Sequence, residues 1–172
     1  MKIGSKFMND SEEKTTVLNK MLDRKHNEND FEIDKKAFIE AMSENGIVSD
    51  TFIVEYLDDK LEEAVLLIKT KLHDEKEIQG IFIVFEVSTN MKDTILFEAM
   101  DYIENKLEDA KYIVIGKQTV EYSRKKIYTL VNYYDSETLI EQVNDSMRRL
   151  QNILDQINKE NEWMNIELIE IL

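Results

Sequence analysis

The amino-acid sequence predicts an α/β (or α+β) fold, in which helices pack on a mixed β-sheet of about four strands and a long C-terminal helix follows. Three observations carry this prediction. The chain has 172 residues, 42% of them hydrophobic, which is enough for a core of ordinary size. Segments with helical spacing of apolar residues alternate with short strand-like segments. Residues 136–172 follow a heptad spacing instead.

The first helix is predicted to begin near Asn9-Asp10-Ser11-Glu12, where a side-chain oxygen can cap a helix with an acidic first turn. Its apolar stripe consists of Val17, Leu18, Met21 and Leu22. The polar run Asp23–Asp30 is predicted to be a loop. Residues 1–29 therefore read as an N-terminal helix and loop, ahead of a main domain over 30–135.

In the main domain, Asp34 can cap a helix that Gly46 ends, because glycine tolerates the positive φ of a helix terminus. The apolar residues of this helix are Phe38, Ile39 and Met42. Thr51–Leu57 alternates as a strand should, and Asp58 or Asp59 is expected to cap the next helix. That helix carries Leu61, Ala64, Val65, Ile68 and Leu72.

The segment Gly80–Val87 is nearly all apolar, which is typical of a central strand covered on both faces. A helix is predicted to open at Asn90 or Asp93 and to carry Ile95, Leu96, Ala99, Ile103 and Leu107. Tyr112–Ile115 and Lys126–Tyr134 are predicted to be further buried strands. A polar hairpin around Ser123 and Arg124 is expected to join them.

The C-terminal helix has an apolar seam. Ile140, Met147 and Leu154 share one heptad position, and Val143, Leu150 and Ile157 share the other. Two interpretations are open: the helix packs on its own domain, or it forms a self-associating or partner-binding coiled coil. After Asn161, the apolar residues from Trp163 to Leu172 form a tail that is expected to be docked or to act as a binding peptide.

The net charge of −14, from 22 basic and 36 acidic residues, argues against binding to nucleic acids and to anionic membranes. Without cysteine, the chain has no disulfide, thiolate nucleophile or zinc–thiolate site. The first residues lack the apolar run of a signal peptide, and no segment has the roughly 18 apolar residues of a membrane span. We therefore expect a cytoplasmic protein.

Four stretches between Asp30 and Tyr134 resemble, in order, the C-terminal domain of FtsZ and the wider tubulin family: DFEIDKKAFIEAMSENG, LDDKLEEAVLLIKTKL, GIFIVFEVS and DTILFEAMDYIENKLEDAKYIVIG. Leu96-Phe97-Glu98 matches a step that begins a family helix, and Gly116 matches a glycine that ends the following strand. Ser88-Thr89-Asn90 stands where the family usually has glycines. The resemblance implies the fold of that domain for residues 30–135.

In that family a separate N-terminal domain holds GTP with a glycine-rich loop. Such a loop needs clustered glycines, so that successive N–H groups can turn toward the phosphates. The four glycines of this chain are far apart: Gly4, Gly46, Gly80 and Gly116. We therefore expect no nucleotide or other cofactor and no catalysis by this chain alone. His26 and His73 have no acidic residue at metal-ligand spacing that stands out from the acidic background, so no metal is expected either.

One loop of the family carries chemistry: an Asn-x-Asp-x-x-Asp pattern enters the nucleotide site of the neighbouring subunit. Here Asp30 and Phe31 keep their places, Glu28 replaces the amide, and Asp34 comes one residue late. The resemblance makes these residues, Asp30, Phe31 and Asp34, candidates for binding a partner, with Asp30 catalytic only in trans on a partner GTPase. The alternative is that Asp30 is a loop acid and Asp34 a helix cap.

Three functions compete. The first is a non-catalytic interaction protein that binds or regulates an FtsZ-type filament in cell division, or the C-terminal half of a split GTPase. The second is a scaffold that self-associates as a homo-oligomer through Ile140–Ile157. The third is a small-metabolite enzyme with a chorismate-mutase-like core, which would need convergent arginines for carboxylates. The available arginines are Arg24, Arg124, Arg148 and Arg149.

Overall fold

The structure is a computed structural model that describes residues 10–72 and 76–171. Side chains are described over 11–72 and 76–135 and, within the C-terminal helix, at 137, 140, 141 and 143–162. The chain divides into two compact units, Met1–Tyr134 and Asp135–Leu172.

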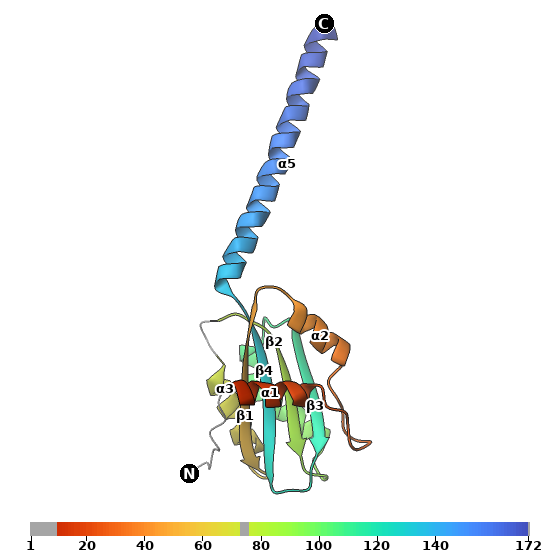
Figure 1. Cartoon of the computed structure of the whole chain (residues 1–172), viewed down its shortest axis with the longest axis vertical. Helices are drawn as coiled ribbons and strands as arrows, with labels where there is room; N and C mark the ends of the chain where they lie inside the picture. Colours follow the sequence, from red (N-terminus) through yellow and green to blue (C-terminus); the bar gives the residue numbers. More distant parts are fainter. Residues whose placement is uncertain (1–9, 73–75, 172) are drawn as a thin grey trace. The chain divides into compact units, whose positions relative to one another are not determined.

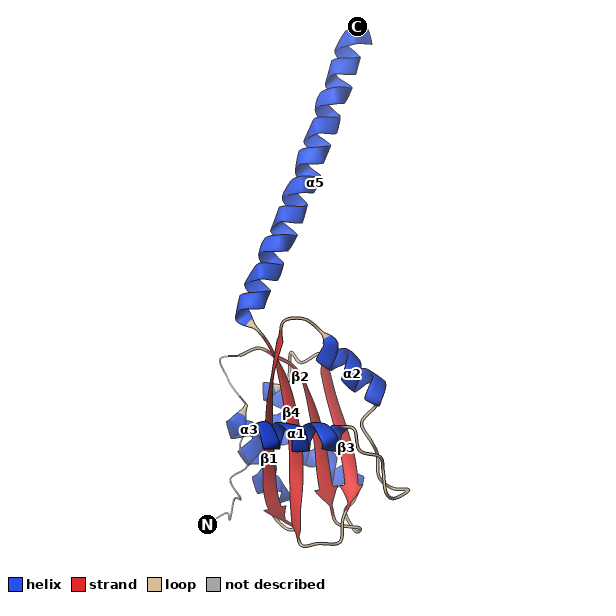
Figure 2. Ribbon diagram, viewed as in Figure 1, coloured by secondary structure: helices blue, strands red, loops and turns tan. Residues whose placement is uncertain are grey.

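The first unit is built on a mixed sheet of four strands in the order β1-β4-β2-β3 (Figure 2). The strands are β1 (Ile47–Leu57), β2 (Ile78–Val87), β3 (Tyr112–Thr119) and β4 (Arg124–Tyr134). β4 is antiparallel to both of its neighbours, β1 and β2, whereas β2 and β3 are parallel. The predicted fold class, a mixed four-stranded sheet packed with helices, is confirmed.

Helices cover both faces of the sheet (Figure 1). On one face lie α1 (Asp10–Met21) and α2 (Lys35–Ser43). Their buried residues pack against the side chains that β2 and β4 present on this face. Together they form one apolar cluster, which comprises Val17, Met21, Ile33, Phe38, Ala41, Phe82, Val84, Tyr128 and Leu130. α1 and the loop after it therefore belong to the same unit as the sheet.

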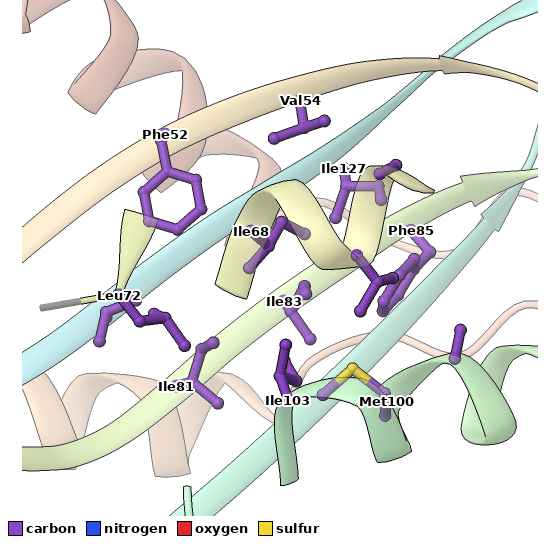
Figure 3. Close-up of a cluster of buried hydrophobic side chains, with 14 of the residues drawn as sticks. Phe52, Val54, Ile68, Leu72, Ile81, Ile83, Phe85, Met100, Ile103 and Ile127 are labelled. Atoms are coloured by element: carbon purple, nitrogen blue, oxygen red, sulfur yellow. The ribbon is translucent and has the colours of Figure 1, made fainter. Parts of the chain in front are cut away.

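The other face is covered by α3 (Leu61–Lys71), α4 (Asp93–Met100) and the 3-10 helix η1 (Asp101–Lys106). Figure 3 shows the larger core cluster formed there, with contributions from β1, α3, β2, α4, η1 and β4. Every residue of β2 is buried, because its alternating side chains enter both clusters. The prediction of a central strand over Gly80–Val87 is thus confirmed.

The predicted hairpin between the last two strands is wrong. β3 and β4 are not neighbours, because β2 lies between them and pairs with both. β3 is an edge strand that continues through Gly116 to Thr119, and its Ile113 is 44% exposed, so the expectation of a buried strand over Tyr112–Ile115 was also wrong. The short connection around Ser123 crosses the end of β2 instead of turning directly back.

Three element boundaries differ from the predictions. β1 begins at Ile47 rather than Thr51, since its pairing with β4 extends along all of its residues. The helix expected to run to Leu107 changes at Asp101 into the 3-10 helix η1. Finally, neither Asp58 nor Asp59 caps α3: the N-cap residue is Lys60, which makes no side-chain capping bond.

The second unit is dominated by one helix, α5 (Ser136–Ile171), of 36 residues. The long C-terminal helix is confirmed as an element. The question of whether the apolar tail from Trp163 to Leu172 is docked or exposed lies outside the described side chains. Among the residues that the structure describes, no helix combines the length and apolar character needed to cross a bilayer.

Candidate functional site

Asp30 is a buried anchor of the loop between α1 and α2. Only 5% of the residue is exposed. Its Oδ1 accepts hydrogen bonds from the backbone N of Thr119 at 2.9 Å and from Thr119 Oγ1 at 2.7 Å, and its Oδ2 accepts one from the backbone N of Asn27 at 3.3 Å. The carboxylate therefore ties the loop to the last residue of β3, which is the geometry of a loop acid.

Phe31 extends the edge of the sheet by one bridge. Its backbone N donates to the Lys117 carbonyl at 3.2 Å, and the backbone N of Lys117 donates back at 2.8 Å. The Phe31 ring stacks on Phe97, with ring centroids 6.5 Å apart and an interplanar angle of 4°. Phe97 is 50% exposed, so the pair presents an aromatic surface to solvent.

The buried Lys117 side chain supports this aromatic pair. Its Nζ lies 5.1 Å from the centroid of the Phe31 ring and 2.7 Å from Asp93 Oδ1 at the start of α4. The ammonium is thus held between a ring face and a carboxylate, where both contacts are electrostatically favourable. Phe31 is consequently fixed in position, and the aromatic surface is a feature of the folded unit.

Asp34 is the N-cap of α2, as the capping interpretation predicted. Its Oδ1 accepts hydrogen bonds from the backbone N of Lys36 at 2.9 Å and of Ala37 at 3.1 Å. Gly46, expected to have positive φ, has φ of 79°, in the turn between α2 and β1. The structure therefore places Asp30, Phe31 and Asp34 along one loop, with both carboxylates holding backbone N–H groups of the chain itself.

We predict that Asp30→Ala lowers the free energy of unfolding by about 2–3 kcal/mol, because the N–H of the half-buried Thr119 loses its charged acceptor. Denaturant unfolding measures this change. The exposed Glu28 in the same loop provides a matched control, Glu28→Ala, which should change stability by less than about 0.5 kcal/mol. Equal effects of the two substitutions would contradict the anchoring role of Asp30.

A second buried carboxylate, Glu86, stands near the end of the apolar strand β2 and is 1% exposed. Its Oε2 accepts from Lys20 Nζ at 3.1 Å and from the Tyr122 hydroxyl at 2.6 Å, and its Oε1 accepts from the backbone N of Lys126 at 2.9 Å. These partners come from α1, the β3–β4 connection and β4. Glu86 therefore joins three segments and has its acceptor sites used within the chain.

Tyrosine hydroxyls surround Glu86, and burial together with its negative charge disfavours their ionisation. Burial and the hydrogen bond to Glu86 raise the pKa of Tyr122 to about 12. Burial raises the pKa of Tyr128 well above its ordinary value, and the charge of Glu86 adds to this shift. Burial, and then the charges of Asp58 and Glu86, likewise raise the pKa of Tyr56. All three tyrosines are neutral at physiological pH.

These shifts predict a loss of stability in alkali. A tyrosine of the unfolded chain releases its proton near pH 10, whereas the folded chain keeps the proton to higher pH. The unfolded state then binds fewer protons, so the free energy of unfolding falls as the pH rises from about 10 to about 12. Denaturant unfolding at several pH values should show this slope, and Tyr128→Phe should reduce it. A slope unchanged in that variant would contradict the assignment.

The hollows of the folded unit differ in size and in how far they are enclosed. The space beside Phe31 and Gly116 has a volume of about 10 Å³, enough for roughly one water molecule. Wider depressions along β1 and beside η1 are open to solvent. Within 10–72 and 76–171, no three His, Cys, Asp or Glu residues are grouped to hold a metal ion.

The four arginines considered for a carboxylate site are all exposed. Arg24 follows α1 and Arg124 begins β4. Arg148 and Arg149 belong to the second unit, where Arg148 pairs with Asp145 of its own helix at 3.2 Å. Each is thus on the surface of its own unit, and none of them lines one of the depressions described above.

The described side chains of α5 include an apolar stripe, which we call the seam. We define the seam as the six residues Ile140, Val143, Met147, Leu150, Leu154 and Ile157, which are between 47% and 63% exposed. A spacing of three and four residues places them on one stripe of the helix. Ile153, which is 52% exposed, broadens this stripe on one side.

The positions that flank the seam carry almost no charge. In the heptad notation with Ile140 at a, the e positions hold Glu137, ahead of the seam, and then Asn144, Gln151 and Asn158. The g positions hold Ser146, Ile153 and Glu160. The remaining charged side chains of the described helix lie at b, c and f, away from the seam. This placement allows two copies of an acidic chain to approach without repulsion between flanking charges.

No protein-family model matches the sequence, and no curated protein matches it either. Among solved structures, a tryptophan-to-tyrosine mutant of FtsZ from M. jannaschii is similar over 73% of this chain and 38% of its own, with 16% identity and a TM-score of 0.47. Thiamine monophosphate kinase from Aquifex aeolicus is similar over 51% of this chain and 34% of its own, with 10% identity and a TM-score of 0.35. A complex of AaThiL with AMPPCP and TMP is similar over 58% of this chain and 40% of its own, with 8% identity and a TM-score of 0.36.

The chain spans between 34% and 40% of the length of these three structures. At these identities and TM-scores, neither a family nor an activity follows from the comparisons. The function has to be argued from the residues of the chain itself.

Proposed function

We propose that this chain is a non-catalytic interaction protein that self-associates through the seam of α5 and so presents more than one copy of its folded unit. The single observation that carries the proposal is the exposure of all six seam residues along one stripe of a 36-residue helix. A helix is only marginally stable in water by itself and gains most of its stability when such a stripe packs against another surface. A second copy of the chain supplies a surface of matching spacing.

The flanking residues favour a second copy over a different, basic partner. A basic helix would be selected by acidic residues at e and g, but the e positions that flank the seam hold amides, with Glu137 ahead of it, and the described g positions hold one carboxylate, Glu160. The remaining acidic residues with described side chains lie at other positions. The overall charge of −14 therefore does not oppose pairing at the seam, although it disfavours less specific contacts between copies.

The proposal is tested by light scattering on the full chain over a range of concentrations. We expect an assembly whose mass falls on dilution, together with a helical signal in circular dichroism that falls with it, because α5 depends on its partner. A chain that is monomeric at every concentration, with unchanged helicity, would overturn the proposal. The measurement needs no knowledge of any other partner.

A second candidate function is favoured by the aromatic pair of Phe31 and Phe97. The resemblance of residues 30–135 assigns the loop that contains Phe31 to contacts with a neighbouring FtsZ-type subunit, and the partly exposed ring of Phe97 supplies apolar surface there. In this proposal the folded unit binds the end of an FtsZ-type filament. Because the described unit offers no nucleotide face of its own, bound copies would stop growth.

Co-sedimentation with a polymerising FtsZ tests this second function. We expect the chain to enter the pellet and to lower the amount of polymer at stoichiometric concentration. Phe97→Ala should weaken both effects, whereas Leu67→Ala, at an exposed residue of α3, should not. Unchanged polymer and GTPase rate in the presence of the chain would exclude filament binding, and the self-association proposal would be unaffected.

A further inference from the structure

We infer that α5 pairs with the same helix of a second copy in parallel and in register, and that Asn161 fixes this arrangement. The inference rests on the self-association proposed above and adds its geometry. It also predicts that a pair of chains carries both folded units at the same end of the coiled coil.

Asn161 continues the heptad spacing of the seam by one position. Ile140, Met147 and Leu154 stand at successive a positions, and the next a position, seven residues after Leu154, is Asn161. Its side chain is exposed in the single chain. In the sequence, the same spacing continues with Met164 and Leu168. Asn161 is thus a polar residue within the apolar repeat and not simply the residue that follows its end.

A polar residue at heptad position a lowers the stability of a coiled coil unless the partner helix offers it a hydrogen bond. The amide of asparagine both donates and accepts, so two copies of Asn161 satisfy each other when they face across the pair. They face each other only if the helices run parallel and in register. In an antiparallel pairing of the described seam, Asn161 would lie opposite its far end, near Ile140, and its amide would be buried against apolar groups.

The other seam residues do not select an orientation or a number of chains as strongly. The amides at e, Asn144, Gln151 and Asn158, form no charge pairs that would prefer a parallel partner. Ile153 at g widens the apolar stripe, and a wider stripe by itself favours assemblies of more than two helices. Asn161 is therefore the residue that restricts the assembly to a parallel pair.

The parallel arrangement has a consequence for binding. β4 ends at Tyr134 and α5 begins at Ser136, so each folded unit is attached directly to the start of the helix. In a parallel pair both units are attached at the same end. A partner with repeated subunits could then engage both copies, and the second contact would benefit from a high effective concentration.

Disulfide trapping tests the orientation, and the cysteine-free chain gives a clean background. Val143→Cys and Ile157→Cys place single thiols near the two ends of the described seam, at d positions. We expect each variant to cross-link to itself under mild oxidation. In an exchanged mixture of the two, one carrying a size tag, no cross-link of mixed size should form. Cross-links of mixed size, with little self-linking, would show antiparallel helices and overturn the inference.

Asn161→Val tests the cause of the arrangement. We expect this variant to resist dissociation at higher denaturant concentration than the natural chain, but to lose its single state, giving masses above two chains or cross-links of both types. Asn152→Val, at the outer f position, is the matched control and should remain a parallel pair. A pure parallel pair in Asn161→Val would overturn the role of Asn161. A monomer in the natural chain would instead overturn the proposed self-association, so the two failures are distinguishable.

Discussion

Leu150→Asp is expected to convert the self-associated chain into a monomer. Leu150 lies at the centre of the seam and is 61% exposed in the single chain, so its apolar side chain is available to a second copy. Truncating a buried leucine costs roughly 2–5 kcal/mol per site, and each pair of chains contains the site twice. The dissociation constant should therefore rise at least about 10³-fold, before the cost of burying two carboxylates is added.

The matched control for this experiment is Asn152→Asp. It makes the same change in charge on the same helix, but at the outer f position, where a carboxylate remains in water. Light scattering of the two variants at equal concentration should give one chain for Leu150→Asp and the natural mass for Asn152→Asp. Dissociation of both variants would mean that net charge, and not the seam, controls association.

Glu86→Ala is expected to cause a large loss of stability in the folded unit, about 3–5 kcal/mol. The substitution removes the common acceptor of the Lys20 ammonium, the Tyr122 hydroxyl and the Lys126 backbone N–H. The Lys20 ammonium would keep its contact with the Tyr128 ring but lose its carboxylate, and the N–H of the half-buried Lys126 would lose its charged acceptor. Both losses are costly. For a domain of ordinary stability this is a large share of the free energy of unfolding.

Denaturant unfolding of Glu86→Ala measures this loss, with Glu55→Ala as the control. Glu55 is an exposed strand residue whose ion pair with Lys126 is long, at 3.9 Å, so its removal should change stability by less than about 1 kcal/mol. Native stability in Glu86→Ala would show that the carboxylate contributes little to joining α1, β2 and β4.

Local patterns in the sequence were sufficient for most of the helices and strands. The caps and apolar spacing placed α1 and α2 closely, and the side chain of Asp34 makes the predicted capping bonds. The apolar composition of β2 correctly indicated a strand buried on both faces. These features depend on interactions within a few residues or on burial alone, and a single sequence records both.

Interactions between distant residues were the ones that the sequence did not reveal. Asp58 was expected to cap α3, but its carboxylate pairs with the buried ammonium of Lys125 on β4. Lys117 is also buried, and its ammonium pairs with Asp93 and lies over the ring of Phe31. Neither partnership has a spacing that could be read from the chain, since each joins separate elements of the sheet and its helices.

Strand order was missed for the same reason. The polar stretch around Ser123 and Arg124 was expected to form a hairpin, yet the two strands that it connects flank β2. Glu86 was a usable signal that was overlooked, because the one carboxylate of a mainly apolar strand must have partners when the strand is buried. Its partners on α1 and β4 could still not have been named from the sequence.

The measurement that tests the central claim most directly is sedimentation equilibrium of the unmodified full chain at micromolar concentrations. Self-association through α5 predicts a mass near twice the 20.4 kDa of one chain, decreasing toward one chain on dilution. A mass of one chain across the whole range would contradict the account, because the six exposed seam residues would then have no second copy to contact.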